Sequence, residues 1–479
     1  MTIDDDACYR ALSARDARFD GVFFIGVKTT GIYCRPVCTA RLPGRDRVRF
    51  FASAALAESE GFRPCLRCRP ELAPGQAPVD AVRTVARVAA SRIEAGALNN
   101  GGSLEELAGD LGLSSRQLRR AVRQELGISP VDLAQTNRLL LAKRLIAETN
   151  LPMIQVAFAS GFESVRRFND LFRAHYRLTP TKMRRWRRTP KSADCLRLML
   201  SYRPPYAWGP LLDFLAMRSI PGVECVADGA YRRTVAIGKD RGWLSVAPVV
   251  GRNLLAVELA TSLTPVLPSI LSRLRNLLDL DARPDVIAGH LRGEENLRRS
   301  VSRLPGLRVP GAFDGFELAL RAILGQQVSV KSASTLAGRL AARFGEPVET
   351  PFACLNRLSA TAERIAAARP SELAKIGIPR ARAETLRAIA RAVVRGEVDF
   401  APGLDPASVV AKLTELPGIG EWTAQYIAMR ALRWPDAFPS GDLGLVRASG
   451  LKSARALRET AEKWRPWRAY AAMYLWESL

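Results

Sequence analysis

Two close pairs of cysteines constrain what the first part of this chain can fold into more than any other feature. Cys34 and Cys38 form the first pair, and Cys65 and Cys68 form the second. Two such pairs a few tens of residues apart have the spacing of a tetrahedral zinc site. Because the whole chain has only two histidines, four thiolates are the only credible ligand set. The sequence therefore predicts a small domain built around one Zn²⁺ ion.

The charge of the chain indicates a polyanionic partner. The sequence has 71 Lys and Arg against 47 Asp and Glu, a net charge of +24. Such a surplus is typical of proteins that bind nucleic acid phosphates, although ribosome-associated and membrane-surface proteins share it. No apolar run is long enough to span a bilayer, and the acidic N-terminus lacks the apolar core of a secretory signal. We therefore expect a cytoplasmic, nucleoid-associated protein with no membrane partner.

The length of 479 residues predicts about three domains at ~150 residues each. The fold class that we expect is multidomain α+β. It combines the four-Cys zinc domain, an all-α tandem helix-turn-helix domain, a mixed α/β lead-in and a helical C-terminal domain, over residues 1–75, 80–188, 195–305 and 306–479. Linkers are expected at 73–78 and 184–191. In the lead-in, strand-like stretches at 234–238 and 243–250 are joined by residues 239–242, which favours a hairpin.

Residues 103–123 are typical of a helix-turn-helix unit. Ser103 and Glu106 are spaced for a capping box at the start of the first helix. The second helix, over residues 115–123, has the layout of a recognition helix in the DNA major groove. Its candidate DNA contacts are Arg116, Gln117 and Arg119.

A second unit of the same kind follows. Its helices are expected over residues 152–158 and 164–172, and a long helix over 131–148 connects the two units. Its candidate DNA contacts are Ser164, Arg166 and Arg167. The competing interpretation is a small helical bundle with an arginine-rich solvated face. Two tandem units joined by one helix favour DNA binding over that interpretation.

The residues around the cysteine pairs resemble those of a known family. Residues 24–38 and 61–68 resemble the N-terminal domain of the Ada family, which repairs methyl phosphotriesters in DNA. The resemblance implies that Cys34 accepts the methyl group in a single turnover. Loss of one thiolate charge would make the cluster less negative and strengthen its contact with DNA phosphates. The competing interpretation is a zinc site with a structural role alone.

The middle domain also resembles a known family. Residues 161–180, including Gly161, Phe162, Phe168 and Phe172, are similar to the signature of AraC-type regulators. The resemblance covers about residues 80–188 and implies sequence-specific binding to successive major grooves of promoter DNA. It also makes RNA polymerase an expected partner.

Residues 416–426 are the decisive segment of the C-terminal part. Gly418 and Gly420 allow a tight hairpin that leads into a helix N-terminus, which suits a DNA phosphate, with a monovalent cation as a bridge. Together with residues 438–444, this segment resembles the helix-hairpin-helix DNA glycosylases, with Asp442 at the position of their essential carboxylate. Strings at 211–215, 321–330 and 464–470 look like the AlkA-type 3-methyladenine DNA glycosylases, over about residues 195–479.

The chemistry that this resemblance implies depends on charge. Alkylation of a purine ring nitrogen makes the base a cation and a good leaving group, so one carboxylate suffices to stabilise the oxocarbenium-like sugar and orient water. We assign both roles to Asp442. The extruded base needs an electron-rich pocket, for which the candidates are Phe214, Trp422, Tyr426 and Trp464. The rival interpretations are a helix N-cap for Asp442 and ordinary core packing for each aromatic ring.

Several absences sharpen the prediction. The hairpin has Glu421 and Trp422 where strand-cutting relatives use a lysine, so we expect no lyase activity. The last cysteine is Cys354, which leaves no ligands for a C-terminal iron–sulfur cluster. Gln326 and Gln327 occupy the place where the family inserts an apolar wedge into DNA. No Pro-Cys-His-Arg string occurs, so repair of O6-methylguanine should be missing.

The sequence thus predicts a monomeric DNA alkylation repair and response protein. It would hydrolyse the N-glycosidic bond of alkylated purines such as 3-methyladenine, take a methyl group onto Cys34 and regulate transcription on double-stranded DNA. The alternative is a damage-responsive transcription factor whose glycosylase-like domain only binds DNA.

Overall fold

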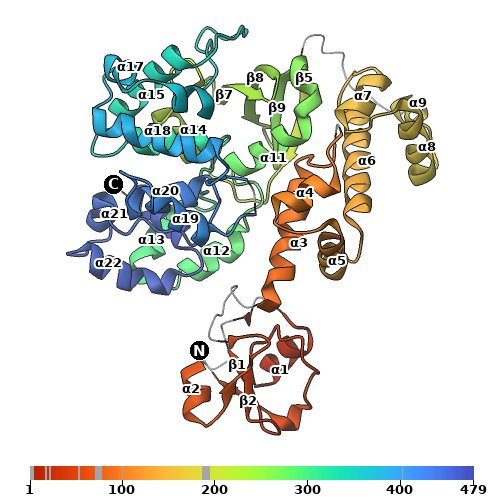
Figure 1. Cartoon of the computed structure of the whole chain (residues 1–479), viewed down its shortest axis with the longest axis vertical. Coiled ribbons are helices and arrows are strands. Elements are labelled where there is room, and N and C mark those ends of the chain that lie inside the picture. The colour runs from red at the N-terminus through yellow and green to blue at the C-terminus, as the bar shows by residue number, and fades with distance from the viewer. Residues whose placement is uncertain are drawn as a thin grey trace. The chain divides into compact units, whose positions relative to one another are not determined.

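The computed structural model describes residues 5–16, 19–20, 23–51, 54–70, 78–99, 101–185, 195–401 and 403–478. The chain divides into two compact units, and each is described by itself below (Figure 1). The first unit comprises residues 1–91 and 103–133, and the second comprises residues 92–102 and 134–479. The linkers predicted at 73–78 and 184–191 lie, apart from their ends, outside the described residues.

A small four-stranded sheet forms the N-terminal part of the first unit. Its strand order is β3-β1-β2-β4, with β1 antiparallel to β2 and β3 and with β2 parallel to β4. Gly26 in β1 is required there because a Cβ atom would lie 2.6 Å from the ring of Phe51 and 2.8 Å from that of Phe62. The elements are α1 (Asp5–Ser13), β1 (Phe24–Val27), β2 (Ile32–Cys34), η2 (Arg45–Arg47), β3 (Val48–Phe51), α2 (Ala54–Ser59) and β4 (Arg63–Pro64).

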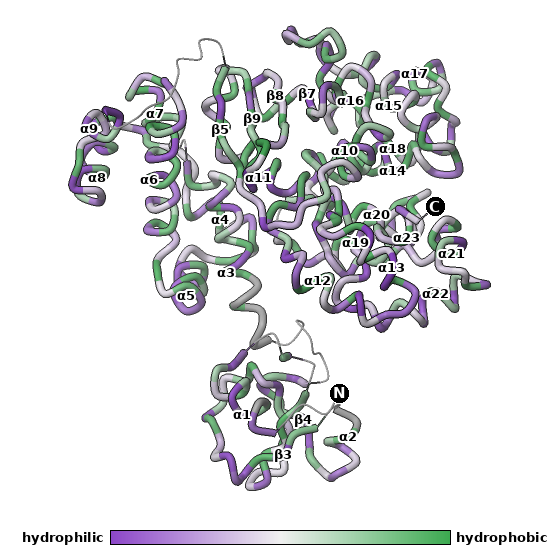
Figure 2. Tube along the Cα trace, turned by 180° about the vertical axis from the view of Figure 1, so that it is seen from behind, coloured by the Kyte–Doolittle hydropathy of each residue, from purple (hydrophilic) through white to green (hydrophobic). Residues whose placement is uncertain are grey.

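Both predicted helix-turn-helix units are present. The first helix-turn-helix consists of α4 and α5, and its predicted capping box is confirmed. Ser103 Oγ accepts the N–H of Glu106, and Glu106 Oε2 accepts the N–H of Ser103, both at 3.0 Å. The predicted connecting helix over 131–148 is observed as α6, along which hydrophobic and hydrophilic stretches alternate in Figure 2. The helices are α3 (Pro78–Glu94), α4 (Leu104–Asp110), α5 (Ser115–Leu126), α6 (Pro130–Glu148), α7 (Met153–Ala159), α8 (Val165–Tyr176) and α9 (Pro180–Arg185).

The lead-in is a five-stranded antiparallel sheet of order β5-β9-β8-β7-β6. The predicted hairpin joins β7 to β8, but its turn is shorter than expected. Ile237 pairs with Asp240, so Gly238 and Lys239 alone form the loop, and Gly238 has a φ of 56°. The elements are β5 (Cys195–Ser201), α10 (Trp208–Met217), β6 (Glu224–Ala227), β7 (Ala230–Ile237), β8 (Asp240–Pro248), β9 (Leu254–Ala260), η4 (Thr261–Val266), α11 (Leu267–Leu277), α12 (Pro284–Leu291) and α13 (Glu295–Arg303).

The rest of the second unit is helical and contains two hydrophobic cores. One core is built mainly by α14, α15, α16, α18, α19 and α20, and the other by α12, α13, α21, α22 and α23 with the end of α20. Helix α20 therefore belongs to both. The helices are α14 (Gly315–Leu324), α15 (Val330–Phe344), α16 (Ala362–Ala367), α17 (Pro370–Lys375), α18 (Arg380–Val394), α19 (Pro406–Thr414), α20 (Glu421–Arg430), α21 (Leu443–Ala448), α22 (Ala454–Ala461), η5 (Glu462–Trp464) and α23 (Arg468–Trp476). None of the helices described is both long and apolar enough to cross a membrane.

Candidate metal centre and active-site cleft

The four predicted ligand cysteines meet at the end of β2. Cys34 is the last residue of that strand, and the sulfur atoms of Cys34, Cys38, Cys65 and Cys68 all lie within 4.8 Å of one another. Four sulfurs at about 2.3 Å from one zinc ion are separated by about 3.8 Å, so the cluster has the size of a ZnS₄ site. Three of the four residues are buried, and Cys65 is half-buried. The residues present fit one Zn²⁺ ion.

The four sulfurs of the cluster differ in the hydrogen bonds that they form. The Arg35 amide N–H donates to the Cys68 sulfur at 3.4 Å, and the Arg35 side chain, which is fully buried, forms an ion pair with Asp20 and donates to the Cys68 carbonyl. Hydrogen bonding to Cys38 raises the pKa of the Cys34 thiol, whereas hydrogen bonding from Cys34 lowers the pKa of Cys38. Four thiols this close together cannot all form good hydrogen bonds with one another. A divalent cation bound by the deprotonated sulfurs would stabilise the cluster instead.

The helix-turn-helix side chains predicted to contact DNA divide into exposed and capping residues. Arg116 and Arg119 on α5 are exposed, as are Arg166 and Arg167 on α8. Gln117 and Ser164 act as caps in this structure. The Gln117 Oε1 atom accepts the Ser114 N–H at 2.9 Å, and the Ser164 hydroxyl accepts the Arg167 N–H at 3.4 Å. Among the four exposed arginines, Arg119 lies 3.8 Å from the Glu105 carboxylate.

A tight hairpin joins α19 to α20. Gly418 has a φ of 83°, and a Cβ atom there would lie 2.1 Å from Thr385 Oγ1, so only glycine fits. Gly420 is the N-cap of α20, whose exposed N-terminus provides free backbone N–H groups. Gln326 braces the hairpin, because its Nε2 donates to the Gly418 carbonyl at 2.9 Å and to Thr423 Oγ1 at 3.0 Å.

Asp442 follows at the N-terminus of α21, and three N–H groups hold its carboxylate. The Trp422 indole donates to Oδ2 at 3.0 Å, the Trp476 indole donates to Oδ1 at 3.2 Å, and the Leu445 amide donates to Oδ1 at 2.9 Å. The N-cap interpretation of Asp442 is therefore correct. It does not compete with a role in chemistry, since the same carboxylate also lines an open cleft.

The cleft beside Asp442 has a volume of about 790 Å³. The rings of Trp422 and Tyr426 stack on one turn of α20, with centroids 5.4 Å apart and planes within 7°. Trp476 meets Tyr426 at an angle of 66° with centroids 6.4 Å apart. These rings provide flat electron-rich faces for a planar guest. Gln326, Gln327, Gly418 and Gly420 also line the cleft.

Two predicted pocket residues lie elsewhere. Trp464 is 1% exposed and packs edge-on against Phe438 in the hydrophobic core, so its assignment to the base pocket was wrong. Phe214 is 4% exposed and does not line the cleft. The Arg218 guanidinium covers its ring, with Cζ 3.7 Å from the ring centroid. Trp476 lines the cleft instead of Trp464. Nothing in the local sequence around Trp476 separates it from a tryptophan of the hydrophobic core.

Three arginines beneath Tyr426 were also missed. Burial alone would raise the pKa of Tyr426, but the positive charges of Arg430, Arg218 and Arg321 outweigh burial and lower that pKa to about 8. Arg430 donates to the Tyr426 hydroxyl at 2.9 Å. Arg218 and Arg321 line the cleft themselves. Arginine on an apolar helix is no sequence signal by itself, because long cationic side chains usually reach solvent.

In the segment predicted to insert a wedge residue into DNA, the Gln326 side chain is hydrogen-bonded and the Gln327 side chain is exposed. Gln326 is tied to the hairpin, as described above. Gln327 is exposed and has a φ of 55°, a left-handed conformation that turns the chain between α14 and α15. Its neighbour Val328 is 38% exposed.

The combination of a tetrathiolate centre, arginine-bearing helix-turn-helix units and a carboxylate beside a hairpin is typical of proteins that act on damaged DNA. Family models agree part by part. The metal binding domain of Ada matches residues 7–71, a helix-turn-helix domain matches 107–185, the AlkA N-terminal domain matches 197–314 and the HhH-GPD superfamily of base excision DNA repair proteins matches 320–465.

Relatives match over the full length. The probable bifunctional transcriptional activator/DNA repair enzyme AlkA of Mycobacterium tuberculosis is 41% identical and covers all of this chain and 97% of that protein. This chain belongs to that family of fused Ada- and AlkA-type proteins. DNA-3-methyladenine glycosylase 2 of Escherichia coli is 38% identical over 58% of this chain and 95% of that protein. A solved 3-methyladenine DNA glycosylase from Archaeoglobus fulgidus covers 58% of this chain and 96% of its own, with a TM-score of 0.50 and 25% identity.

Proposed function

We propose that this chain is a DNA alkylation repair and response protein, with a base-releasing glycosylase, a zinc-thiolate methyl acceptor and a transcription regulator on one polypeptide. The observation that carries the proposal is the position of Asp442, whose carboxylate lines the aromatic cleft while three N–H groups fix its orientation. The domain borders that we propose are 1–75, 80–188, 195–305 and 306–479.

In the proposed glycosylase reaction, an alkylated purine leaves the DNA stack and enters the cleft. Trp422, Tyr426 and Trp476 offer faces on which a planar base can stack. The bond between the sugar and the base nitrogen breaks, and its electron pair leaves with the base. The Asp442 carboxylate stabilises the positive charge that develops on the sugar and orients the water that adds to it. Residues 415–425, which form the hairpin and the start of α20, contain no lysine, so the reaction ends at an abasic site without strand cleavage.

Two features near the cleft are suited to holding the DNA. The N-terminus of α20 presents backbone N–H groups behind Gly418 and Gly420, where a phosphate gains hydrogen bonds and the favourable end of a helix dipole. A monovalent cation on hairpin carbonyls would join the same phosphate. Gln327 is the wedge residue that we propose, because its side chain is exposed and lines the cleft, whereas Gln326 is bonded to the hairpin.

The methyl acceptor that we propose is Cys34. Its sulfur attacks the methyl carbon of a phosphotriester, a carbon–sulfur bond forms, and the carbon–oxygen bond breaks to release a phosphodiester anion. A zinc ion bound by the four sulfurs keeps them deprotonated at neutral pH. Cys38 and Cys68 accept backbone N–H groups of Ala40 and Arg35, which lowers their nucleophilicity. No described backbone N–H donates to the Cys34 sulfur, and that difference supports Cys34 over Cys38 and Cys68.

The regulatory part of the proposal rests on the exposed arginines of α5 and α8. Arg116, Arg119, Arg166 and Arg167 would contact promoter DNA, and RNA polymerase would be the partner recruited there. Methylation of Cys34 removes one negative charge from the cluster, so the methylated protein should bind its promoter more tightly. Equal affinities of the two forms would refute this switch.

We further propose that the protein acts as a monomer at the nucleoid and needs no iron–sulfur cluster. The last cysteine of the chain is Cys354, before the C-terminal region in which such clusters are bound. Sedimentation at working concentration, and iron analysis of the purified protein, test these two points.

Two assays on one sample test the whole proposal. After incubation with methylated duplex DNA, chromatography of the supernatant should detect free 3-methyladenine, and Asp442→Asn should abolish that release. Mass spectrometry of the same protein should find one added methyl group on the peptide that carries Cys34. Binding of methylated DNA without base release would favour the alternative of a transcription factor with a glycosylase-like domain. Absence of the methyl group would leave the zinc centre with a structural role alone.

A further inference from the structure

The turn that carries the proposed wedge residue is held by a side chain from outside the cleft. This wedge turn spans residues 325–329, between α14 and α15. Arg382, in the first turn of α18, donates from Nη2 to the Gln326 carbonyl at 2.7 Å. Arg382 is not among the residues that line the cleft. It therefore acts on the backbone of the wedge turn and not on the bound base.

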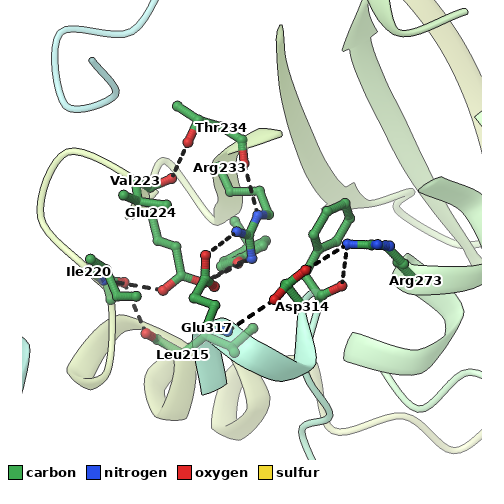
Figure 3. A network of polar contacts seen from close by, with 12 residues as sticks. Leu215, Ile220, Val223, Glu224, Arg233, Thr234, Arg273, Asp314 and Glu317 are labelled. Carbon is green, nitrogen blue, oxygen red and sulfur yellow. Dashed lines mark hydrogen bonds and ion pairs between the residues drawn. The ribbon is translucent and has the colours of Figure 1, made fainter. Parts of the chain in front are cut away.

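The start of α14 is fixed without the help of Arg382 (Figure 3). Glu317 forms an ion pair with Arg233 of β7 at 2.8 Å, and Asp314 pairs with Arg273 of α11 at 3.1 Å. Asp314 also caps the helix, since its Oδ1 accepts the Glu317 N–H at 3.0 Å. Glu317 and Arg233 are both buried, which strengthens their attraction. Helix α14 is thus anchored on the lead-in sheet, and the wedge turn follows its other end.

Helix α18 supports the wedge turn and the hairpin together. Gln326 gives its backbone carbonyl to Arg382, and its side-chain Nε2 donates to the Gly418 carbonyl at 2.9 Å and to Thr423 Oγ1 at 3.0 Å. Thr385 lies three residues after Arg382 on the same helix. It fills the space beside Gly418, where a Cβ atom would lie 2.1 Å from Thr385 Oγ1.

The backbone that Arg382 holds is in an unfavourable conformation. Gln327 follows the bonded carbonyl directly, and its φ of 55° lies in the left-handed region that side chains other than glycine rarely adopt. Arg382 forms no ion pair with any described carboxylate, whereas its neighbour Arg380 lies 3.2 Å from Glu384. A charged donor binds a carbonyl more strongly than a neutral one, so Arg382 is suited to holding this turn.

We propose that Arg382 is a positioning residue for the wedge. Its bond to the Gln326 carbonyl keeps Gln327 in the left-handed conformation in which this side chain lines the cleft, so the wedge and the hairpin meet the DNA as one unit. Without the bond the turn relaxes toward ordinary backbone conformations, and Gln327 no longer enters the gap left by the extruded base. The inference deepens the glycosylase function proposed above, on which it rests.

The fluorescence of a stacked base measures wedge insertion without any bond breaking. The probe is a duplex in which 2-aminopurine stands next to a tetrahydrofuran abasic-site analogue, and its emission rises when a side chain enters the gap and unstacks it. At saturating protein, Arg382→Met should lower the equilibrium constant for insertion by about tenfold or more, the usual effect of losing a hydrogen bond from a charged group.

Arg380→Met is the matched control for this measurement. It removes the same charge from the same turn of α18, but from a side chain that is 87% exposed. It should change the insertion constant by less than about twofold, because exposed ion pairs contribute little. Arg382→Lys keeps a charged donor and should restore part of the signal. If Arg382→Met does not fold, Arg382→Gln takes its place, because it retains a neutral donor, and an intermediate loss is expected.

A double-mutant cycle separates positioning of the wedge from a direct contact with DNA. The readout is the single-turnover rate of 3-methyladenine release from methylated DNA. Arg382→Met should lower this rate by about tenfold in the wild-type background. In the Gln327→Ala background the same change should cost less than about twofold, because no wedge side chain remains to be placed.

Two results would overturn the inference. One is an unchanged fluorescence signal in Arg382→Met, and the other is an equal loss of rate in both backgrounds, which would make Arg382 a contact with a DNA phosphate. A wild-type protein that releases the base without raising the fluorescence would also refute it and leave the glycosylase function intact. A wild-type protein that raises the fluorescence but releases no base would refute the proposed glycosylase function instead.

Discussion

At the zinc centre four sulfurs lie within 4.8 Å of one another, whereas the cleft gathers three arginines and one carboxylate around its aromatic rings. Both sites are proposed to act on alkylated DNA, but the zinc centre carries negatively charged thiolates and the cleft carries positively charged arginines. A methyl carbon on a phosphotriester is an electrophile, so an electron-rich sulfur attacks it and is consumed. An alkylated base only has to leave, so the cleft holds the base and stabilises the sugar, and the site is free to act again.

The sites also differ in how the chain builds them. Every zinc ligand lies within one small sheet domain, between Cys34 and Cys68. The cleft is assembled from Arg218 at the end of α10 to Trp476 at the end of α23. A local site is disrupted mainly by the loss of its own ligands, whereas a dispersed site also depends on the packing of distant elements.

The largest effect is expected at the acceptor sulfur. Cys34→Ser removes the proposed methyl acceptor, so the protein should take up no methyl group from methylated DNA, while base release continues at the wild-type rate. Cys195→Ser changes a half-buried cysteine that is not one of the four clustered cysteines; it is the control and should still be methylated. Intact-mass measurement reads both. Methyl uptake by Cys34→Ser would move the acceptor to another sulfur.

The hairpin glycines provide a matched pair with the next largest effect. Gly418→Ala meets Thr385 Oγ1 at 2.1 Å and needs a φ of 83°, whereas Gly420 has a φ of −87° and nothing within 4 Å of a new Cβ atom. Backbone strain of about 1–3 kcal/mol should weaken binding to duplex DNA by roughly 10- to 100-fold in Gly418→Ala. Gly420→Ala should change it far less. Equal losses, measured by titration at one salt concentration, would show that the strained turn is not what positions the hairpin.

A smaller effect separates the two C-terminal tryptophans. Trp476→Phe keeps an aromatic ring but removes the donor to Asp442, so single-turnover base release should slow about tenfold, the usual cost of a hydrogen bond to a charged group. Trp464→Phe removes no bond, since its buried Nε1 has no partner among the described residues, and should leave the rate unchanged. The reverse order of effects would restore Trp464 to the base pocket.

The smallest effect is a pH dependence of stability. The Tyr426 pKa of about 8 lies below the ordinary value of about 10 for an unfolded chain. The unfolded state therefore binds more protons between these values, and the phenolate stabilises the fold increasingly from pH 8 to pH 10. This stabilisation is lost as the pH falls through 8, and it amounts to about 1 kcal/mol at pH 9. Urea unfolding of wild type and Tyr426→Phe at pH 7 and pH 9 measures it. A constant difference between the two proteins would contradict the lowered pKa.

These contrasts also explain which parts the sequence could predict. The cysteine pairs, the Ser103–Glu106 capping box and the β7–β8 hairpin are specified by residues close in the chain, and each is present, although the hairpin turn is shorter than expected. Local patterns report local geometry well because caps, turns and metal spacings have fixed offsets. The exchange of Trp464 for Trp476 could not be foreseen, since burial of a tryptophan depends on how α23 packs against its neighbours.

The arginines of the cleft escaped for the same reason. Arg218, Arg321 and Arg430 stand on separate helices or helix ends, and their shared surroundings exist only after folding. An aromatic cage for a cationic base was expected, and the aromatic rings are there, but positive charge lies beside them. Charge balance in a buried cluster depends on pairs such as Arg233 with Glu317, which are 84 residues apart in the chain.

The central claim is that Asp442 breaks the glycosidic bond and does not merely cap α21. Asparagine caps a helix about as well as aspartate, so Asp442→Asn separates the two roles. With methylated DNA and saturating enzyme, the single-turnover rate of 3-methyladenine release should fall by about 10³-fold while DNA affinity and unfolding remain those of wild type. A variant that releases the base at the wild-type rate would show that this carboxylate holds only the helix.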